Sequence, residues 1–112
     1  MNVTTVMAQV IVSDLERSVE FYTRLFGRGP DANPMDKLQE WHFTDAGAIQ
    51  VYEEPERAGR SGATINVSDL DGAVAALDAA DIAHEPLVEA NYVRVVQLGD
   101  PDQNRIVLTG AK

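Results

Sequence analysis

Few side chains in this sequence could support metal or acid–base chemistry. There is no cysteine, which excludes a disulfide scaffold, a thiolate zinc site and a cysteine nucleophile. Only two histidines are present, and His42 lies two residues after Glu40, so the two share a face if this segment is a strand. They could act as metal ligands, as a base oriented by a carboxylate, or as a plain polar surface. His84, beside Glu85, is expected at a surface or a sheet edge.

The composition describes a folded domain with a strongly acidic surface. The 112 residues include 18 acidic and 9 basic side chains, a net charge of −9, and 45% are hydrophobic. A chain of this size can bury a core as one domain. The charge argues against binding to nucleic acids or anionic membranes, which require a basic surface. Neither a membrane span nor a signal peptide is evident, so we expect a cytoplasmic protein.

An internal repeat divides the chain into two halves. Residues 12–16, Val-Ser-Asp-Leu-Glu, recur as residues 67–71, Val-Ser-Asp-Leu-Asp, at an offset of 55 positions. In both copies an apolar run precedes the motif and a helical pattern follows it. A repeat at a fixed offset indicates repeated structural units. We therefore expect one domain, residues 1–112, made of modules 1–55 and 62–112 joined by a linker at 54–61.

The first module should contain a strand, a helix and a hairpin. Alternating residues predict a strand over 3–12, with Val10 and Val12 on one face and Met7 and Gln9 on the other. Asp14 is a good N-cap for a helix that Gly27 should end in the left-handed conformation. Residues 28–37 should be mostly loop, with room for a short edge strand. Two strands, over 38–44 and 48–53, should follow, joined by a turn at 45–47.

The second module should repeat this plan. We expect a strand over 63–68, a helix capped by Asp69 and running to about Ala80, and strands over 82–88, 92–98 and 105–109. The predicted fold class is α+β, with two tandem β-α-β-β-β modules forming a curved mixed sheet around a concave cavity. Each module should carry its helix on one face of its sheet and leave the other face free to form the cavity.

Two motifs resemble a known superfamily. Residues 12–22, Val-Ser-Asp-Leu-Glu-Arg-Ser-Val-Glu-Phe-Tyr, resemble the first strand-to-helix segment of vicinal oxygen chelate proteins. Residues 100–104, Asp-Pro-Asp-Gln-Asn, resemble the turn before their last strand. That superfamily includes glyoxalase I, extradiol dioxygenases, fosfomycin-resistance enzymes and bleomycin-resistance proteins. The resemblance covers essentially the whole chain and implies the paired-module fold, but fold does not fix activity.

The resemblance also identifies four positions where the superfamily's enzymes hold a metal ion. In this sequence those positions are Met7, Gln50, Gly62 and Val107. Gly and Val side chains offer no donor atom, and the thioether of Met suits copper(I) better than a hard divalent ion. The resemblance therefore implies a branch that binds small molecules without a metal ion, so we expect neither a metal nor a cofactor.

The residues expected to line the cavity are a mixture of apolar and amide side chains, typical of a site for a neutral or weakly polar organic ligand. Trp41 could be a stacking wall, a subunit contact or part of the core, and the hydroxyl of Tyr92 could bond a ligand or water. These same side chains could instead fill the cavity and leave no ligand site. The candidates are Met7, Gln9, Trp41, Gln50, Tyr52, Asn66, Tyr92 and Val107.

The leading hypothesis is a homodimeric, metal-free protein that binds or sequesters a small organic molecule, either an antibiotic or a metabolite. Glu53, Glu54 and Glu56 would attract a cationic glycopeptide such as bleomycin, unless they are merely solvated. One alternative is a glyoxalase-like lyase or a dioxygenase whose atypical metal site is built on Gln50, Glu40 and His42. A second alternative is a structural or partner-binding module with a filled cavity.

Overall fold

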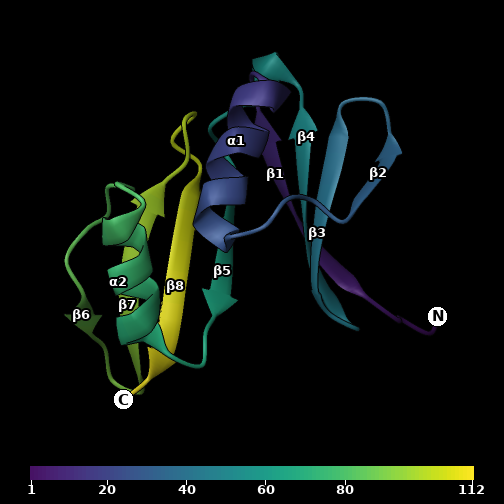
Figure 1. Cartoon of the computed structure of the whole chain (residues 1–112). Helices are drawn as coiled ribbons and strands as arrows, with labels where there is room; N and C mark the ends of the chain where they lie inside the picture. The colour runs from purple at the N-terminus through teal and green to yellow at the C-terminus, as the bar shows by residue number, and fades with distance from the viewer.

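The computed structural model describes residues 1–112 and contains two four-stranded mixed sheets with two α-helices (Figure 1). The strand orders, β1-β4-β3-β2 and β5-β8-β7-β6, are equivalent, as the sequence repeat predicts. The first module contains β1 (Val6–Val12), α1 (Leu15–Phe26), β2 (Ala32–Met35), β3 (Leu38–Thr44) and β4 (Gly47–Glu53). The second contains β5 (Gly62–Asn66), α2 (Leu70–Ala79), β6 (Val88–Glu89), β7 (Val93–Gly99) and β8 (Arg105–Ala111). The short helix η1 (Pro55–Arg57) lies between them.

The ends of the helices follow from local sequence. The Asp14 carboxylate accepts a hydrogen bond from the Arg17 amide at 3.1 Å and caps α1. Gly27 ends the helix with φ at +74°, which glycine adopts without steric cost. Asp69 caps α2 in the same way through the Gly72 amide. The repeated Ser-Asp-Leu motif is therefore the start of each helix.

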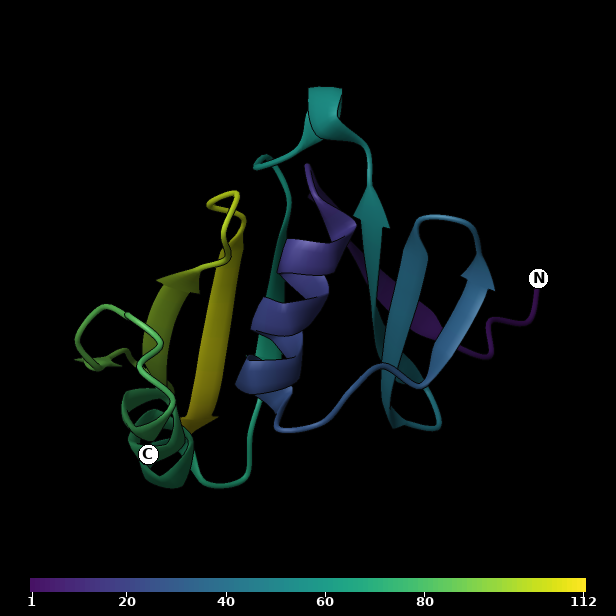
Figure 2. The same ribbon diagram turned by 45° about the horizontal axis from the view of Figure 1, so that its top comes forward.

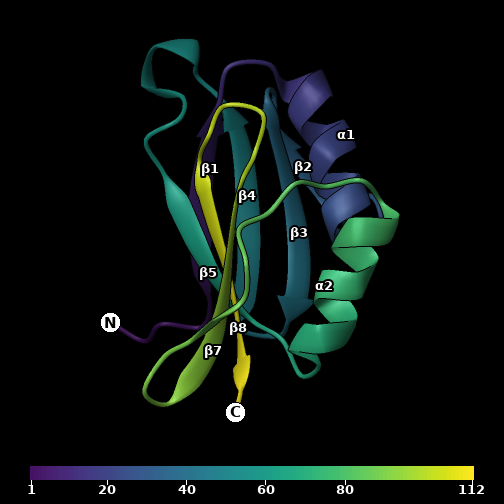
Figure 3. The ribbon, with the colours of Figure 1, turned by 90° about the vertical axis from the view of Figure 1, so that its left-hand side faces the viewer.

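Both helices cover the same side of the two sheets (Figure 3), and α1 lies over the boundary between the sheets (Figure 2). A single core of 13 buried side chains forms between the helices and the sheets and is shared by both modules. Burial of this shared apolar surface is the main force that joins the modules. The core residues are Val10, Val12, Tyr22, Trp41, Ile49, Val51, Leu70, Leu77, Ile82, Val96, Leu98, Ile106 and Leu108.

A buried polar network joins the two modules at the Asp-Pro-Asp-Gln-Asn turn. The Tyr22 hydroxyl of α1 donates a 2.7 Å hydrogen bond to Asp100, which is 1% exposed. Asn104 donates from its side chain to Asp100 and to the Ile11 carbonyl. Its own side-chain oxygen accepts hydrogen bonds from Ser61. In this structure the motif fixes the position of module two against the β1 end of module one.

One predicted strand is largely wrong. The segment 82–88 was expected to be a full strand, but only Val88 and Glu89 pair with β7. Pro86 has no amide hydrogen and cannot donate to a strand ladder, so pairing stops there. The Glu85 amide makes one isolated bond to the Gln97 carbonyl at 2.8 Å. The first strand is also shorter than expected, because it begins at Val6 and not at residue 3.

Candidate ligand-binding site

The side of the sheets away from the helices carries most of the candidate residues of module one. Gln9 of β1, Gln50 of β4 and Glu40 of β3 are register partners on adjacent strands. Register partners point to the same face of a sheet, so the three side chains form one row. We call this surface of β1, β4 and β3 the open face. Val10 and Val12 of β1 lie in the core between the sheets and the helices. Successive residues of a strand point to opposite faces, so Gln9 and the open face lie on the side away from α1.

The centre of the row is a buried carboxylate. Glu40 is 5% exposed, and its two oxygens accept hydrogen bonds from Gln50 Nε2 at 2.6 Å and from His42 Nε2 at 2.8 Å. The hydrogen bond from Gln50, and then that from His42, hold the pKa of Glu40 below its usual range. The carboxylate is therefore ionised at neutral pH, and it fixes the orientation of both neighbouring side chains.

The groups left free on the open face are neutral. Gln50 uses its amide nitrogen on Glu40, and its amide oxygen has no protein partner. The exposed Gln9 side chain forms no hydrogen bond within the chain, and Met7 is 41% exposed. On the other side of the row lies Tyr52, a half-buried residue that is the register partner of the buried Ile11. The surface thus combines amide donors and acceptors with apolar flanks, which suits a small organic ligand.

The residues of the structure do not fit the metal ion of the superfamily's enzymes. No group of three or more His, Cys, Asp or Glu side chains lies close enough together to hold a metal ion. A side chain at Gly62 would meet the Arg105 carbonyl oxygen at 2.9 Å, so the position cannot simply accept a ligand residue. An ion at Glu40 would have to displace the hydrogen bonds from Gln50 and His42. The side chains at these positions therefore do not match the ligand set of a hard divalent ion.

Trp41 requires a correction, because the structure places it in the core and not at a ligand surface. It is fully buried, and its indole nitrogen donates to the Arg28 carbonyl at 2.9 Å. Its ring packs against Tyr22 and Phe26 of α1. Trp41 follows Glu40 on the same strand and so points to the opposite face. That alternation is visible in the sequence and assigns Trp41 to the helix side once Glu40 is placed on the open face.

The candidates of module two do not all lie together. Val107 of β8 is half-buried and lies in register between Thr64 of β5 and Gln97 of β7. Asn66 lies at the end of β5, where its side-chain oxygen accepts a hydrogen bond from Thr109. Tyr92 is 89% exposed in the turn between β6 and β7, away from this row. Thr64 shares the row and was not among the sequence candidates.

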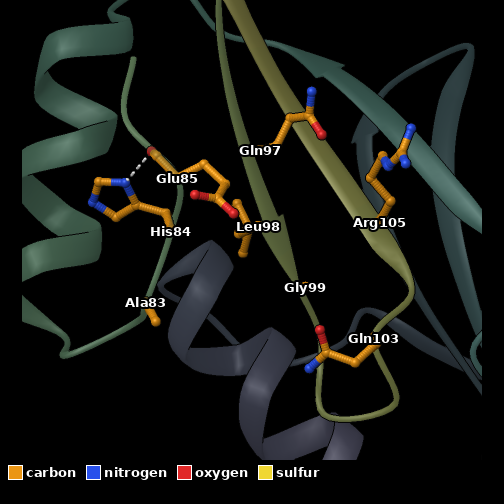
Figure 4. A pocket seen from close by; sticks show the side chains of 8 residues that line it. All are labelled: Ala83, His84, Glu85, Gln97, Leu98, Gly99, Gln103 and Arg105. Carbon is orange, nitrogen blue, oxygen red and sulfur yellow. Dashed lines mark hydrogen bonds between the residues drawn. The ribbon is translucent and has the colours of Figure 1, made fainter. Parts of the chain in front are cut away.

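Sequence reasoning also missed two adjoining cavities along β7. Their volumes are about 380 and 300 Å³, and both are lined by Glu85 and Gln97. None of the eight sequence candidates lines either cavity. Figure 4 shows the side chains around the larger one. The only sequence signal for this site is Pro86, which interrupts the pairing of the segment that borders β7. Together the two cavities are lined by Ala83, His84, Glu85, Pro86, Val88, Val95, Gln97, Leu98, Gly99, Gln103 and Arg105.

The fold and the open face define a class of protein. Two β-α-β-β-β modules, with both helices on one side and a free sheet surface on the other, form a duplicated α+β scaffold. The chain belongs to the Glyoxalase/Bleomycin resistance protein/Dioxygenase superfamily, whose family model matches residues 4–108. No helix of the structure has the length and apolar character needed to cross a membrane.

Several solved structures share this fold. A glyoxalase/bleomycin resistance protein from Catenulispora acidiphila is 26% identical, with a TM-score of 0.89 over 97% of this chain and 99% of that one. TnmS3, an antibiotic binding protein from a Streptomyces strain, is 22% identical, with a TM-score of 0.81 over 96% and 95% of the two chains. A lactoylglutathione lyase from Agrobacterium tumefaciens is 15% identical, with a TM-score of 0.77 over 98% and 95%. No curated protein matches the chain significantly.

Proposed function

We propose that the protein binds a small organic molecule on the open face without a metal ion. The observation that carries this proposal is the Glu40 carboxylate, whose two oxygens are occupied by Gln50 and His42. The strongest potential metal ligand on this surface is therefore already satisfied within the chain. What remains for a ligand are the neutral groups of Met7, Gln9 and Gln50.

The expected ligand is a neutral or weakly polar organic molecule, such as an antibiotic or a metabolite. Gln50 Oε1 can accept a hydrogen bond and the Gln9 amide can both donate and accept. Met7 adds a flexible apolar contact that adapts to different ligand shapes. The likeness to TnmS3, which is an antibiotic binding protein, supports an antibiotic as one ligand class. Val107 and Asn66 would contribute contacts from module two.

We also propose that the protein works as a homodimer in the cytoplasm. Large apolar side chains are exposed in both modules, including Val6 at 70%, Phe43 at 41% and Val93 at 37%. A second copy would cover such surface, because apolar sheet surface is stabilised by packing against another layer. Sedimentation equilibrium tests the dimer, and a monomer at micromolar concentration would contradict it.

Ligand binding is tested by calorimetric titration of the purified protein with bleomycin and a panel of planar antibiotics in the presence of EDTA. Trp41 fluorescence is a poor readout, because its ring is buried away from the open face. Gln50→Ala should weaken binding. Glu20→Gln is the matched control, because Glu20 is exposed on α1 and makes no hydrogen bond or ion pair. Equal affinity of both variants would contradict the assigned site.

One observation favours a second candidate function. Gln50, Glu40 and His42 are joined by hydrogen bonds, so the three residues of the alternative metal site do lie together. An enzyme of the glyoxalase or dioxygenase type would require a metal ion to displace those bonds. Metal analysis of protein purified without chelators decides between the two functions. A stoichiometric transition metal, together with a rise in Tm when nickel, zinc, iron or manganese is added, would favour the enzyme.

A further inference from the structure

A groove along β7 in module two is lined by different residues from the open face of module one. We call the two adjoining cavities of about 380 and 300 Å³ the β7 groove. It follows the segment 83–88, which borders the outer edge of β7. Pro86 prevents a full ladder, so that segment bonds to Gln97 only through the Glu85 amide. The groove therefore results from a local interruption of the sheet.

The larger cavity carries two opposite charges that are not paired. Arg105 and Glu85 both line it, yet neither side chain forms an ion pair or a hydrogen bond within the chain. Six of the nine basic side chains do form ion pairs, and Arg24 bonds a carbonyl oxygen. Arg105 and Arg60 are the remaining two. In a chain with twice as many acidic as basic residues, an unpaired arginine in a cavity is available for an external anion.

The two charges lie on opposite sides of β7. Arg105 is on β8, the inner neighbour of β7, and Glu85 borders the outer edge. Gln97 of β7 lies between them and lines the same cavity (Figure 4). The side-chain amide of Gln97 has no partner within the chain. The arrangement presents a cation, an amide and an anion across one strand, which matches a ligand carrying both a carboxylate and an ammonium group.

The smaller cavity adds an apolar surface to this polar end. It is lined by Pro86, Val88 and Val95 in addition to Glu85 and Gln97. Val88 is 58% exposed and is paired with Val95 on the neighbouring strand, so their side chains form a continuous apolar surface. A ligand whose charged groups lie between Arg105 and Glu85 can place an aliphatic side chain there.

We propose that the β7 groove binds a free α-amino acid with an apolar side chain. Arg105 binds the carboxylate, Glu85 binds the ammonium group and Gln97 bonds the carboxylate or the amine between them. Val88 and Val95 contact the aliphatic side chain. This site goes beyond the proposed ligand of the open face, since it uses none of the residues assigned to that ligand.

The test is calorimetric titration of the whole protein with L-leucine and two analogues that each lack one charge. L-Leucinamide has no carboxylate and N-acetyl-L-leucine has no ammonium group. We expect saturable binding of L-leucine and about tenfold weaker binding of each analogue, as for the loss of one charge-assisted contact. An absence of saturable leucine binding, or equal binding of either analogue, would overturn the proposal.

Variants connect the binding to the assigned residues. Arg105→Gln and Glu85→Gln should each weaken leucine binding about tenfold while the Tm stays unchanged, because both residues are exposed. Arg60→Gln is the matched control, since Arg60 is the other unpaired arginine and lies outside the groove. Gln50→Ala should leave leucine binding intact, so failure of the open-face ligand is distinguishable from failure of this site. Equal leucine affinity of the Arg105 and Arg60 variants would contradict the site.

Discussion

Gln50 and Glu40 are register partners on β4 and β3, and the Gln50 amide donates a 2.6 Å hydrogen bond to the Glu40 carboxylate. The other carboxylate oxygen accepts from His42. Glu40 is buried, and no lysine or arginine forms an ion pair with it. The carboxylate is therefore held by its two hydrogen bonds to Gln50 and His42. This relationship makes the open face a fixed array of polar groups.

Removal of the Glu40 carboxylate should destabilise the protein. Glu40→Ala removes the buried acceptor of the hydrogen bonds from Gln50 and His42, and hydrogen bonds to a charged group contribute about 1.5–3 kcal/mol. Urea denaturation of the variant should show this loss in the free energy of unfolding. Glu56→Ala, at an exposed position with no partner, should change stability by less than about 0.5 kcal/mol. Equal stability of the two variants would show that the hydrogen bonds from Gln50 and His42 to Glu40 do not stabilise the fold.

The same carboxylate should make stability dependent on acid pH. Its pKa is lowered in the folded protein, first by the hydrogen bond from Gln50 and then by that from His42. It therefore contributes stability above the unfolded pKa of about 4.3, and that contribution is lost as the pH falls through the lower folded value. Urea midpoints measured from pH 7 to pH 2 should fall more steeply for the wild type than for Glu40→Gln. Parallel pH profiles would contradict this assignment.

The link between the modules should depend on Tyr22. Tyr22→Phe removes the hydrogen bond to Asp100, and bonds to charged groups contribute about 1.5–3 kcal/mol. Burial, followed by the charge of Asp100, raises the pKa of the Tyr22 hydroxyl. Its contribution is therefore present below the unfolded pKa of about 10 and is lost as the pH rises above it. The fall in Tm between pH 8 and pH 11 should therefore be smaller for Tyr22→Phe than for the wild type.

The linker should tolerate no side chain at Gly59. Its φ is +84°, and a Cβ atom there would meet the Asp102 carbonyl oxygen at 2.6 Å. Gly59→Ala should therefore lower the free energy of unfolding by more than about 1 kcal/mol, from backbone strain and displacement of the turn. Gly29→Ala is the control, because its Cβ would meet nothing within 4 Å and its φ is not positive. A similar unfolding midpoint for both variants would contradict the close approach of linker and turn.

Local sequence patterns were sufficient to predict most of the fold. The repeated Val-Ser-Asp-Leu motif indicated both helix starts, and alternation separated Val10 and Val12 from Met7 and Gln9 on the two faces of β1. The segment 82–88 was mispredicted because its apolar residues suggested a strand, while Pro86 removed the amide that the ladder needs. The packing of α1 across the sheet boundary depends on tertiary contacts between distant residues, which no local pattern contains.

The candidate site was less predictable than the fold. Adjacency of Gln9, Gln50 and Glu40 follows from the strand register, and register is set by pairing between distant segments. The sequence placed Glu40 and His42 on one face, but their shared hydrogen bonds needed the structure. The β7 groove was not predicted at all, because it depends on the unpaired edge beside Pro86 and on the absence of a partner for Arg105.

The most direct test of metal-independent binding is the affinity of one organic ligand measured with and without metal. Bleomycin, or another member of the antibiotic panel that binds, is titrated into protein treated with EDTA and into protein supplied with nickel or zinc. Metal-independent binding on the open face predicts the same Kd in both samples and a weaker Kd for Gln50→Ala. Binding that appears only after metal is added, or no binding by any ligand of the panel, would contradict it.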